Sequence, residues 1–185
     1  MLLDKFKAKA EAVNSEVHRF ATKAETLHFI MSFLQKEEVA ELPGAYAVWA
    51  DSPFLQRIQK EQLALKVPGL KFDVTRETAA SAKIGISQMN WAIADTGTLV
   101  QDLTDLSQRL ASALPEIHIA LLESHRIELN MVFLLKKISL ETTPYLAFIT
   151  GPSRNADIER GFTIGAHGPE RLVIVFVDEV SRGRR

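Results

Sequence analysis

Four short segments of this chain are apolar at nearly every position, and they constrain the fold more than any other feature. They are residues 45–49, 117–122, 145–149 and 172–177. A strand that is apolar on both faces belongs to a parallel sheet covered on both sides, whereas a half-exposed strand alternates apolar and polar residues. Segments with helical periodicity separate several of these runs. The sequence therefore predicts an α/β fold with a mostly parallel sheet and helices on both faces.

The N-terminal segment is predicted to be helical. Residues 2–21 carry apolar side chains at helical spacing, which indicates one amphipathic helix. Thr22 and Glu25 then have the spacing of a capping box, which begins a second helix. We therefore expect an N-terminal helical hairpin in residues 1–40, packed on an α/β domain of residues 41–185, with a single domain overall.

Composition limits the classes of function. The chain has 22 Lys and Arg residues against 23 Asp and Glu residues, a net charge of -1, whereas a nucleic-acid-binding protein usually has a clustered basic surface. It has no cysteine, so it cannot hold an iron–sulfur cluster through the usual thiolates. No apolar run approaches the length of a membrane-spanning helix. We expect a cytoplasmic protein without a nucleic-acid partner, a membrane span or a bound metal.

Two glycine-bearing loops contain most of the side chains that are suited to binding or catalysis. Residues 150–153 (Thr-Gly-Pro-Ser) stop the third apolar run, and Ser153 or Asn155 is placed to cap a following short helix. The second loop, residues 165–169, carries His167 between glycines. Such loops also occur as plain structural turns, so the pattern alone leaves both interpretations open.

Other polar residues allow a chemical and a structural interpretation in the same way. Asp95 is a candidate general base, or a turn residue that binds local amides. Arg109 and Ser112 suit a carboxylate or phosphate, because a guanidinium pairs bidentately with such oxyanions, but they also suit a helix cap. His118 lies inside an apolar run, which is more typical of a core histidine than of a catalyst. His167 is the better candidate for an acid, a base or a hydrogen-bond donor.

The long loop region also carries a family resemblance. Residues 150–159, followed by residues 165–169, resemble the signature of the lactate utilization protein C family, also called the LUD-domain family. Shorter matches are residues 94–100, residues 109–115 and His118. The chain departs from the family pattern at Asp95, where the family usually has glutamate, and at Asn155, where it usually has threonine.

The resemblance implies a fold similar to the NagB/RpiA/CoA-transferase group. It also implies a soluble, cluster-free subunit of a bacterial system that oxidises L-lactate to pyruvate. In that system iron–sulfur clusters are expected in the partner proteins, and no cofactor is bound by this chain. Two alternatives stay open: a stand-alone enzyme or binding protein for a phosphorylated or CoA-linked small molecule, and a scaffolding module without catalysis.

The resemblance and the loops together give a set of candidate site residues. The ligands of doubly wound sheets bind beyond the carboxyl ends of the strands, and we expect the candidate loops to gather there around a small carboxylate or phosphate-bearing ligand. The candidate catalytic residues are His167 and Asp95. The candidate substrate-binding residues are Thr96, Gly97, Arg109, Ser112, Thr150, Gly151, Ser153, Arg154 and Gly168.

Overall fold

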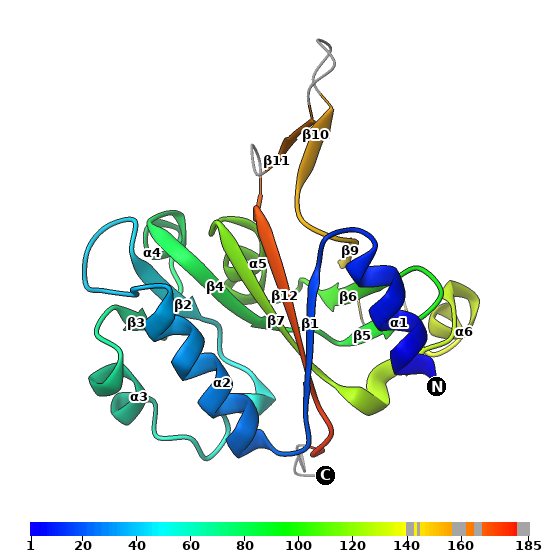
Figure 1. Ribbon diagram of the computed structural model, residues 1–185, viewed down its shortest axis with the longest axis horizontal. Coiled ribbons are helices and arrows are strands. Elements are labelled where there is room, and N and C mark those ends of the chain that lie inside the picture. Colours follow the sequence, from blue (N-terminus) through cyan, green and yellow to red (C-terminus); the bar gives the residue numbers. More distant parts are fainter. Residues whose placement is uncertain (140–142, 144, 157–161, 165–167, 181–185) are drawn as a thin grey trace.

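The predicted parallel sheet is confirmed. The computed structural model describes residues 1–139, 143, 145–156, 162–164 and 168–180. Its main sheet has six strands in the order β1-β12-β7-β4-β2-β3, and all neighbouring strands are parallel (Figure 1). The strands are β1 (Glu16–Phe20), β12 (Arg171–Val177), β7 (Ile117–Glu123), β4 (Ala82–Gln88), β2 (Tyr46–Trp49) and β3 (Leu70–Lys71).

Helices cover both faces of this sheet, as the apolar strands require. Side chains such as Trp49, Ile119 and Val175 form one core with α2 (Lys23–Lys36) and α3 (Lys60–Lys66). The opposite face is covered by α1 (Leu2–Glu11), α4 (Arg76–Ala80) and α5 (Leu106–Ala113). Every residue of β7 is buried, which is the burial expected of a central strand between two layers.

A second, four-stranded sheet packs on the same face as α1. Its order is β8-β5-β6-β9, and its core contact joins Phe6 of α1 and Leu99 to Phe176 of β12. Its strands are β8 (Ile127–Glu128), β5 (Trp91–Ile93), β6 (Thr98–Asp102) and β9 (Leu146–Ile149). We expected residues 145–149 in the parallel sheet, but β9 is an edge strand antiparallel to β6. Phe148 is 43% exposed, so an apolar run alone did not distinguish a central strand from this edge.

The predicted helix over residues 2–21 is wrong beyond its first half. Helix α1 ends at Glu11, and Asn14 then takes a positive φ of 66°, which a helix does not allow. Residues Glu16–Phe20 form β1, which pairs in parallel with β12. The N-terminal segment is therefore no helical hairpin, because a strand of the main sheet separates α1 from α2.

Some helical elements are short. The elements η1 (Pro53–Leu55) and η2 (Ser124–Arg126) are single 3-10 turns, and α6 (Met131–Leu135) has five residues.

The short helix expected after residue 153 is also replaced. Residues Arg154–Ala156 form strand β10, antiparallel to β11 (Phe162–Ile164). Figure 1 shows this pair projecting beyond the amino end of β12. A strand therefore stands where we expected the first residues of a capped helix.

Candidate ligand cavity at the amino ends of the strands

A cavity of about 320 Å³ lies between α5, β9 and the amino ends of β7 and β12. This volume is at the small end of the roughly 300–1,000 Å³ that ligand pockets occupy. Its lining is mostly apolar, with a few polar groups, as in most small-molecule sites. The residues are Leu103, Arg109, Ser112, Ala113, His118, Ala147, Phe148, Ile149, Thr150, Gly151, Pro152, Ser153, Gly168, Pro169 and Leu172. Six of the predicted substrate-binding residues are therefore brought together.

The cavity lies at the opposite edge of the sheet from the one that we expected. His118 and Leu172 are each the second residue of their strands, so the cavity lies at the amino ends of β7 and β12 and not at the carboxyl ends. The reason is the path of the chain between β9 and β12. The chain returns from the β10–β11 pair to the start of β12, and it carries the second loop with it.

The first loop contacts Gly168 and Pro169, the described end of the second loop, on one side of this cavity. The backbone N–H of Ser153 donates a 2.8 Å hydrogen bond to the carbonyl oxygen of Pro169. A Cβ added at Gly168 would lie 3.1 Å from Cβ of Ser153, which is closer than an ordinary van der Waals contact. A glycine at this position therefore allows the close approach. His167, the predicted catalytic residue of the second loop, lies outside the described residues.

Helix α5 reaches the cavity because β4 contains a glycine under it. A Cβ added at Gly85 would lie 1.9 Å from the carbonyl oxygen of Ala111, so no larger residue fits there. The helix begins at Asp105, whose carboxylate accepts a 2.7 Å hydrogen bond from the N–H of Ser107. The close contact with β4 places Arg109 and Ser112 on the wall of the cavity.

His118 is buried and lines the cavity, a position that the apolar sequence around it did not indicate. Its side chain is only 1% exposed, and Nε2 lies 2.7 Å from Oγ of Ser87, itself fully buried on the adjacent strand β4. Nδ1 forms no hydrogen bond with any described residue. Burial lowers the pKa of His118 to about 3, so the imidazole is neutral at physiological pH.

The remaining polar groups differ in how far they are already bonded. The hydroxyls of Thr150 and Thr98 lie 2.8 Å apart, and the Ser112 hydroxyl donates to the carbonyl oxygen of Arg109 at 3.1 Å. The Arg109 side chain is exposed at the rim, and its guanidinium makes no hydrogen bond or ion pair within the described part of the chain. A guanidinium in that state is available to an oxyanion.

Four of the predicted site residues lie elsewhere. Asp95, Thr96 and Gly97 form the turn between β5 and β6, where the N–H of Gly97 donates to the carbonyl oxygen of Ile93. Arg154 directs its guanidinium to the carbonyl oxygen of Val13, 3.0 Å away, and does not line the cavity. One carboxylate oxygen of Asp95 is buried without a hydrogen-bond partner among the described residues. The structure thus favours the interpretation of Asp95 as a turn residue over its interpretation as a general base.

No three His, Asp or Glu side chains in the described part of the chain lie together in a way that would hold a metal ion. No helix there has both the length and the apolarity that crossing a bilayer requires.

The fold and this site place the chain in a known class. A crystal structure of a DUF162 family protein from Deinococcus radiodurans has the same fold, with a TM-score of 0.66 over 95% of this chain and 96% of that chain, at 18% identity. Residues 3–177 match the LUD domain family, and the chain belongs to that family. The predicted likeness to the NagB/RpiA/CoA-transferase group stays a prediction.

Named relatives share part of the sequence. A lactate utilization protein C of Exiguobacterium is 32% identical over 114 residues, which are 58% of this chain and 50% of that protein. The corresponding protein of Bacillus mycoides is 34% identical over 107 residues, or 55% and 46% of the two chains. A lactate utilization protein B of Shouchella clausii is 32% identical over 111 residues, 56% of this chain but 22% of its own length. The chain spans about half the length of the protein C relatives that it matches.

Proposed function

We propose that this chain is the cluster-free member of a bacterial L-lactate utilization system and that its 320 Å³ cavity binds the carboxylate of L-lactate or pyruvate. The relatives named lactate utilization protein C and B support the system. The observation that carries the proposal is Arg109, whose guanidinium has no partner among the described residues and stands at the rim of a cavity that also contains several hydroxyl groups. A carboxylate that pairs with Arg109 would place its short carbon chain against the apolar lining.

His118 has the properties needed to bind the second oxygen of a 2-hydroxy or 2-oxo acid. It lines the cavity, and Ser87 occupies Nε2, so Nδ1 is the ring atom that remains for a ligand. A neutral imidazole accepts a hydrogen bond at one nitrogen and donates at the other. If Ser87 donates to Nε2, then Nδ1–H donates to the ligand oxygen, and if Ser87 accepts, Nδ1 accepts from the hydroxyl.

A separate electron acceptor is part of the proposal. Oxidation of L-lactate to pyruvate releases two electrons and two protons, and the side chains of this sequence include no thiolate that could hold an iron–sulfur cluster. In our proposal the iron–sulfur partner proteins accept the electrons, and this chain holds and orients the acid. The carboxylate position fixed by Arg109 then determines where the reacting carbon lies.

Calorimetry with L-lactate and pyruvate tests the binding step. We expect Arg109→Gln to weaken binding by roughly 10- to 100-fold, because a charge-assisted hydrogen bond is worth about 1.5–3 kcal/mol. Arg76→Gln is the matched control. It removes the same charge from exposed α4, and Arg76 lines neither this cavity nor the larger one described below, so the affinity should not change.

Association with the partners is a separate test. We expect the purified chain to form a complex with iron–sulfur lactate-utilization proteins of the same bacterium in size-exclusion chromatography. The proposal fails if neither acid binds and no complex forms. Binding that is equal in wild type and Arg109→Gln would remove the assigned function of this cavity even if a complex forms.

A further inference from the structure

A larger cavity, of about 970 Å³, opens at the opposite edge of the main sheet. It lies where β12 ends at Val177, where α2 begins after β1, and where η1 follows β2. In parallel α/β sheets this carboxyl edge is where ligands usually bind. None of its lining residues belongs to the polar glycine loops, and none is among the candidate site residues predicted from the sequence.

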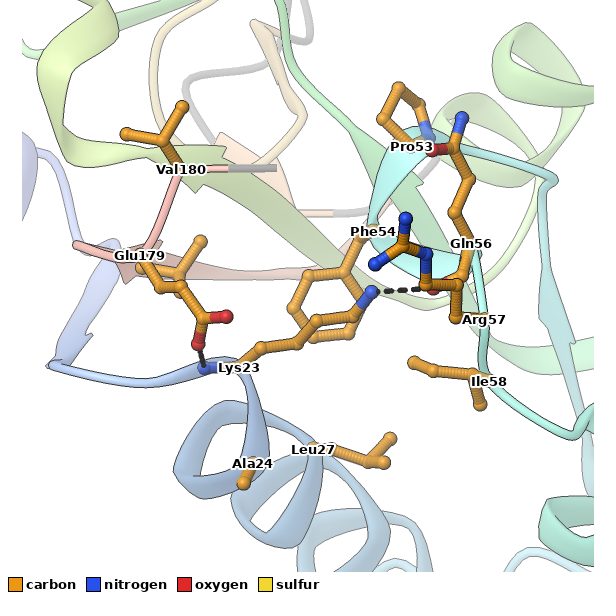
Figure 2. Close-up of a pocket in the computed structure, with 11 residues that line it drawn as sticks. Lys23, Ala24, Leu27, Pro53, Phe54, Gln56, Arg57, Ile58, Glu179 and Val180 are labelled. Carbon is orange, nitrogen blue, oxygen red and sulfur yellow. Dashed lines mark hydrogen bonds between the residues drawn. The ribbon is translucent and has the colours of Figure 1, made fainter. Parts of the chain in front are cut away.

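The walls of this cavity combine cationic side chains with apolar surface. Leu27, Phe54 and Ile58 supply apolar surface, while Lys23 and Arg57 supply positive charge. Figure 2 shows the Lys23 side chain extending from the start of α2 to the carbonyl oxygen of Gln56, to which its ammonium donates at 2.8 Å. The same ammonium lies 5.2 Å from the ring centroid of Phe54.

One carboxylate of the chain already lies in this cavity. Glu179 accepts a 2.8 Å hydrogen bond from the backbone N–H of Lys23, in the first turn of α2 (Figure 2). Among the described residues it makes no ion pair with the ammonium of Lys23 or with the guanidinium of Arg57. The Arg57 side chain is exposed and has no hydrogen-bond or ion-pair partner among those residues. Within the described part of the chain, no carboxylate therefore contacts either cation of the cavity directly.

Burial adds a second electrostatic argument. It lowers the pKa of Lys23, Arg57 acts in the same direction, and Glu179 partly opposes them. A lowered pKa means that the charged ammonium is less stable here than in water. An anion bound beside Lys23 and Arg57 would relieve that cost, because an opposite charge nearby favours the charged form.

We propose that this cavity is a second ligand site, separate from the lactate cavity, and that it binds an organic anion with an apolar body. The carboxylate or phosphate group of the ligand pairs with Arg57 and Lys23, and its apolar part packs on Leu27, Phe54 and Ile58. The volume exceeds what a three-carbon acid fills, so the proposed ligand is a larger anion than L-lactate. Glu179 competes with the anionic group for the same positive environment.

The test is displacement of a fluorescent probe, 8-anilinonaphthalene-1-sulfonate, from the full chain. Octanoate and octyl phosphate are the anionic competitors, 1-octanol is the neutral one, and inorganic phosphate lacks the apolar body. We expect octanoate or octyl phosphate to displace the probe, whichever head group fits better, and 1-octanol and inorganic phosphate to displace it at least tenfold less well. Equal displacement by 1-octanol would overturn the proposal, because it would show an apolar cavity without anion recognition.

Variants separate charge from folding. Arg57 has a positive φ of 64°, which asparagine tolerates, so Arg57→Asn removes the charge without new backbone strain. We expect about tenfold weaker binding of the anionic competitor in Arg57→Asn and retained binding in Arg57→Lys. Glu179→Gln keeps the acceptor for the N–H of Lys23 but removes the negative charge, so it should bind severalfold more tightly. Unchanged binding of the anionic competitor in both Arg57→Asn and Glu179→Gln would refute the site.

A control distinguishes the two cavities. Arg109→Gln, which weakens L-lactate binding in the first proposal, should leave displacement of the probe by octanoate or octyl phosphate unchanged. If L-lactate fails to bind while the anionic competitors bind through Arg57, the first proposal fails and this one stands. Loss of competitor binding in Arg109→Gln would contradict the second site.

Discussion

Oγ of Ser87 on β4 lies 2.7 Å from Nε2 of His118 on β7, and both side chains are buried beneath the small cavity. The pair restrains the imidazole through one nitrogen, and Nδ1 forms no hydrogen bond with any described residue. It also explains how a histidine is tolerated inside an apolar strand, because the ring is neutral and one nitrogen is already bonded.

The first prediction concerns the effect of His118 on stability at acidic pH. Its folded-state pKa of about 3 lies below the ordinary value of 6.5, so between these values the unfolded chain binds a proton that the folded chain does not. The free energy of unfolding must therefore fall as the pH falls from 6.5 toward 3. Between pH 6 and pH 4 we expect wild type to lose about 2 kcal/mol more than His118→Gln, at up to about 1.4 kcal/mol per pH unit. Urea unfolding at the two pH values measures the difference, and parallel losses in both proteins would show that His118 is not buried.

The second prediction concerns the close contact between β4 and α5. Gly85→Ala places a methyl group 1.9 Å from the carbonyl oxygen of Ala111, so the helix must move away from the sheet. We expect a loss of about 3 kcal/mol in the free energy of unfolding, at the upper end of overpacking costs. Gly44→Ala is the contrast. It has a positive φ of 84° but no atom within 4 Å of the added Cβ, so it should lose only the backbone cost of about 1–2 kcal/mol. Equal losses would argue against the contact.

A third prediction tests the meeting of the two loops. Gly168→Ala would bring a Cβ to 3.1 Å from Cβ of Ser153 and 3.2 Å from its Oγ, so the loops must separate by a few tenths of an ångström. We expect severalfold weaker binding of L-lactate by calorimetry, with a change in the free energy of unfolding of less than about 1 kcal/mol. Unchanged L-lactate binding with a large loss in the free energy of unfolding would show that this contact contributes to folding and not to binding.

The fourth prediction concerns an ion cluster that joins β12 to the end of α2. Burial tends to raise the pKa of Glu37, but hydrogen bonds from Arg171 (2.8 Å) and Lys83 outweigh it, and the net shift is downward. A lowered carboxylate pKa stabilises the fold above the unfolded-state value and loses that contribution as the pH falls through the folded-state value.

For this cluster we expect Glu37→Gln to reduce the free energy of unfolding by about 1–2 kcal/mol at pH 7, because hydrogen bonds to charged groups are lost. The difference from wild type should shrink below pH 4.5, where Glu37 of the wild type takes up a proton. Glu38→Gln changes an exposed neighbour and should be close to neutral. A Glu37→Gln penalty that is the same at pH 7 and pH 3.5 would exclude an electrostatic origin.

The fold was predictable where burial leaves a strong pattern in the residues. The apolar run 172–177 identified a central strand because both of its faces are covered. Residues Glu16–Phe20 did not identify a strand, because β1 is the edge of the sheet and its mixed residues fit helical spacing as well. The run 145–149 was recognised as a strand but assigned to the wrong sheet, since pairing depends on distant partners.

The site was predictable only in part for a related reason. The meeting of Ser153 with the loop at Gly168 follows from turn residues that are visible in the sequence. The contribution of His118 depends on Gly85 and Ser87, which lie on a neighbouring strand and carry no local signal of their own. The cavity lined by Lys23 and Arg57 is formed by segments after three different strands, and no single motif includes them.

The position of β12 between β1 and β7 has a consequence for synthesis on the ribosome. Residues 16–20 emerge early, yet the strand with which they pair is formed by residues 171–177. Strand β1 therefore stays unpaired for most of translation, and β7 keeps one open edge until β12 follows. A chain that stops before β12 keeps both edges open, and we expect such a product to need a chaperone or to aggregate.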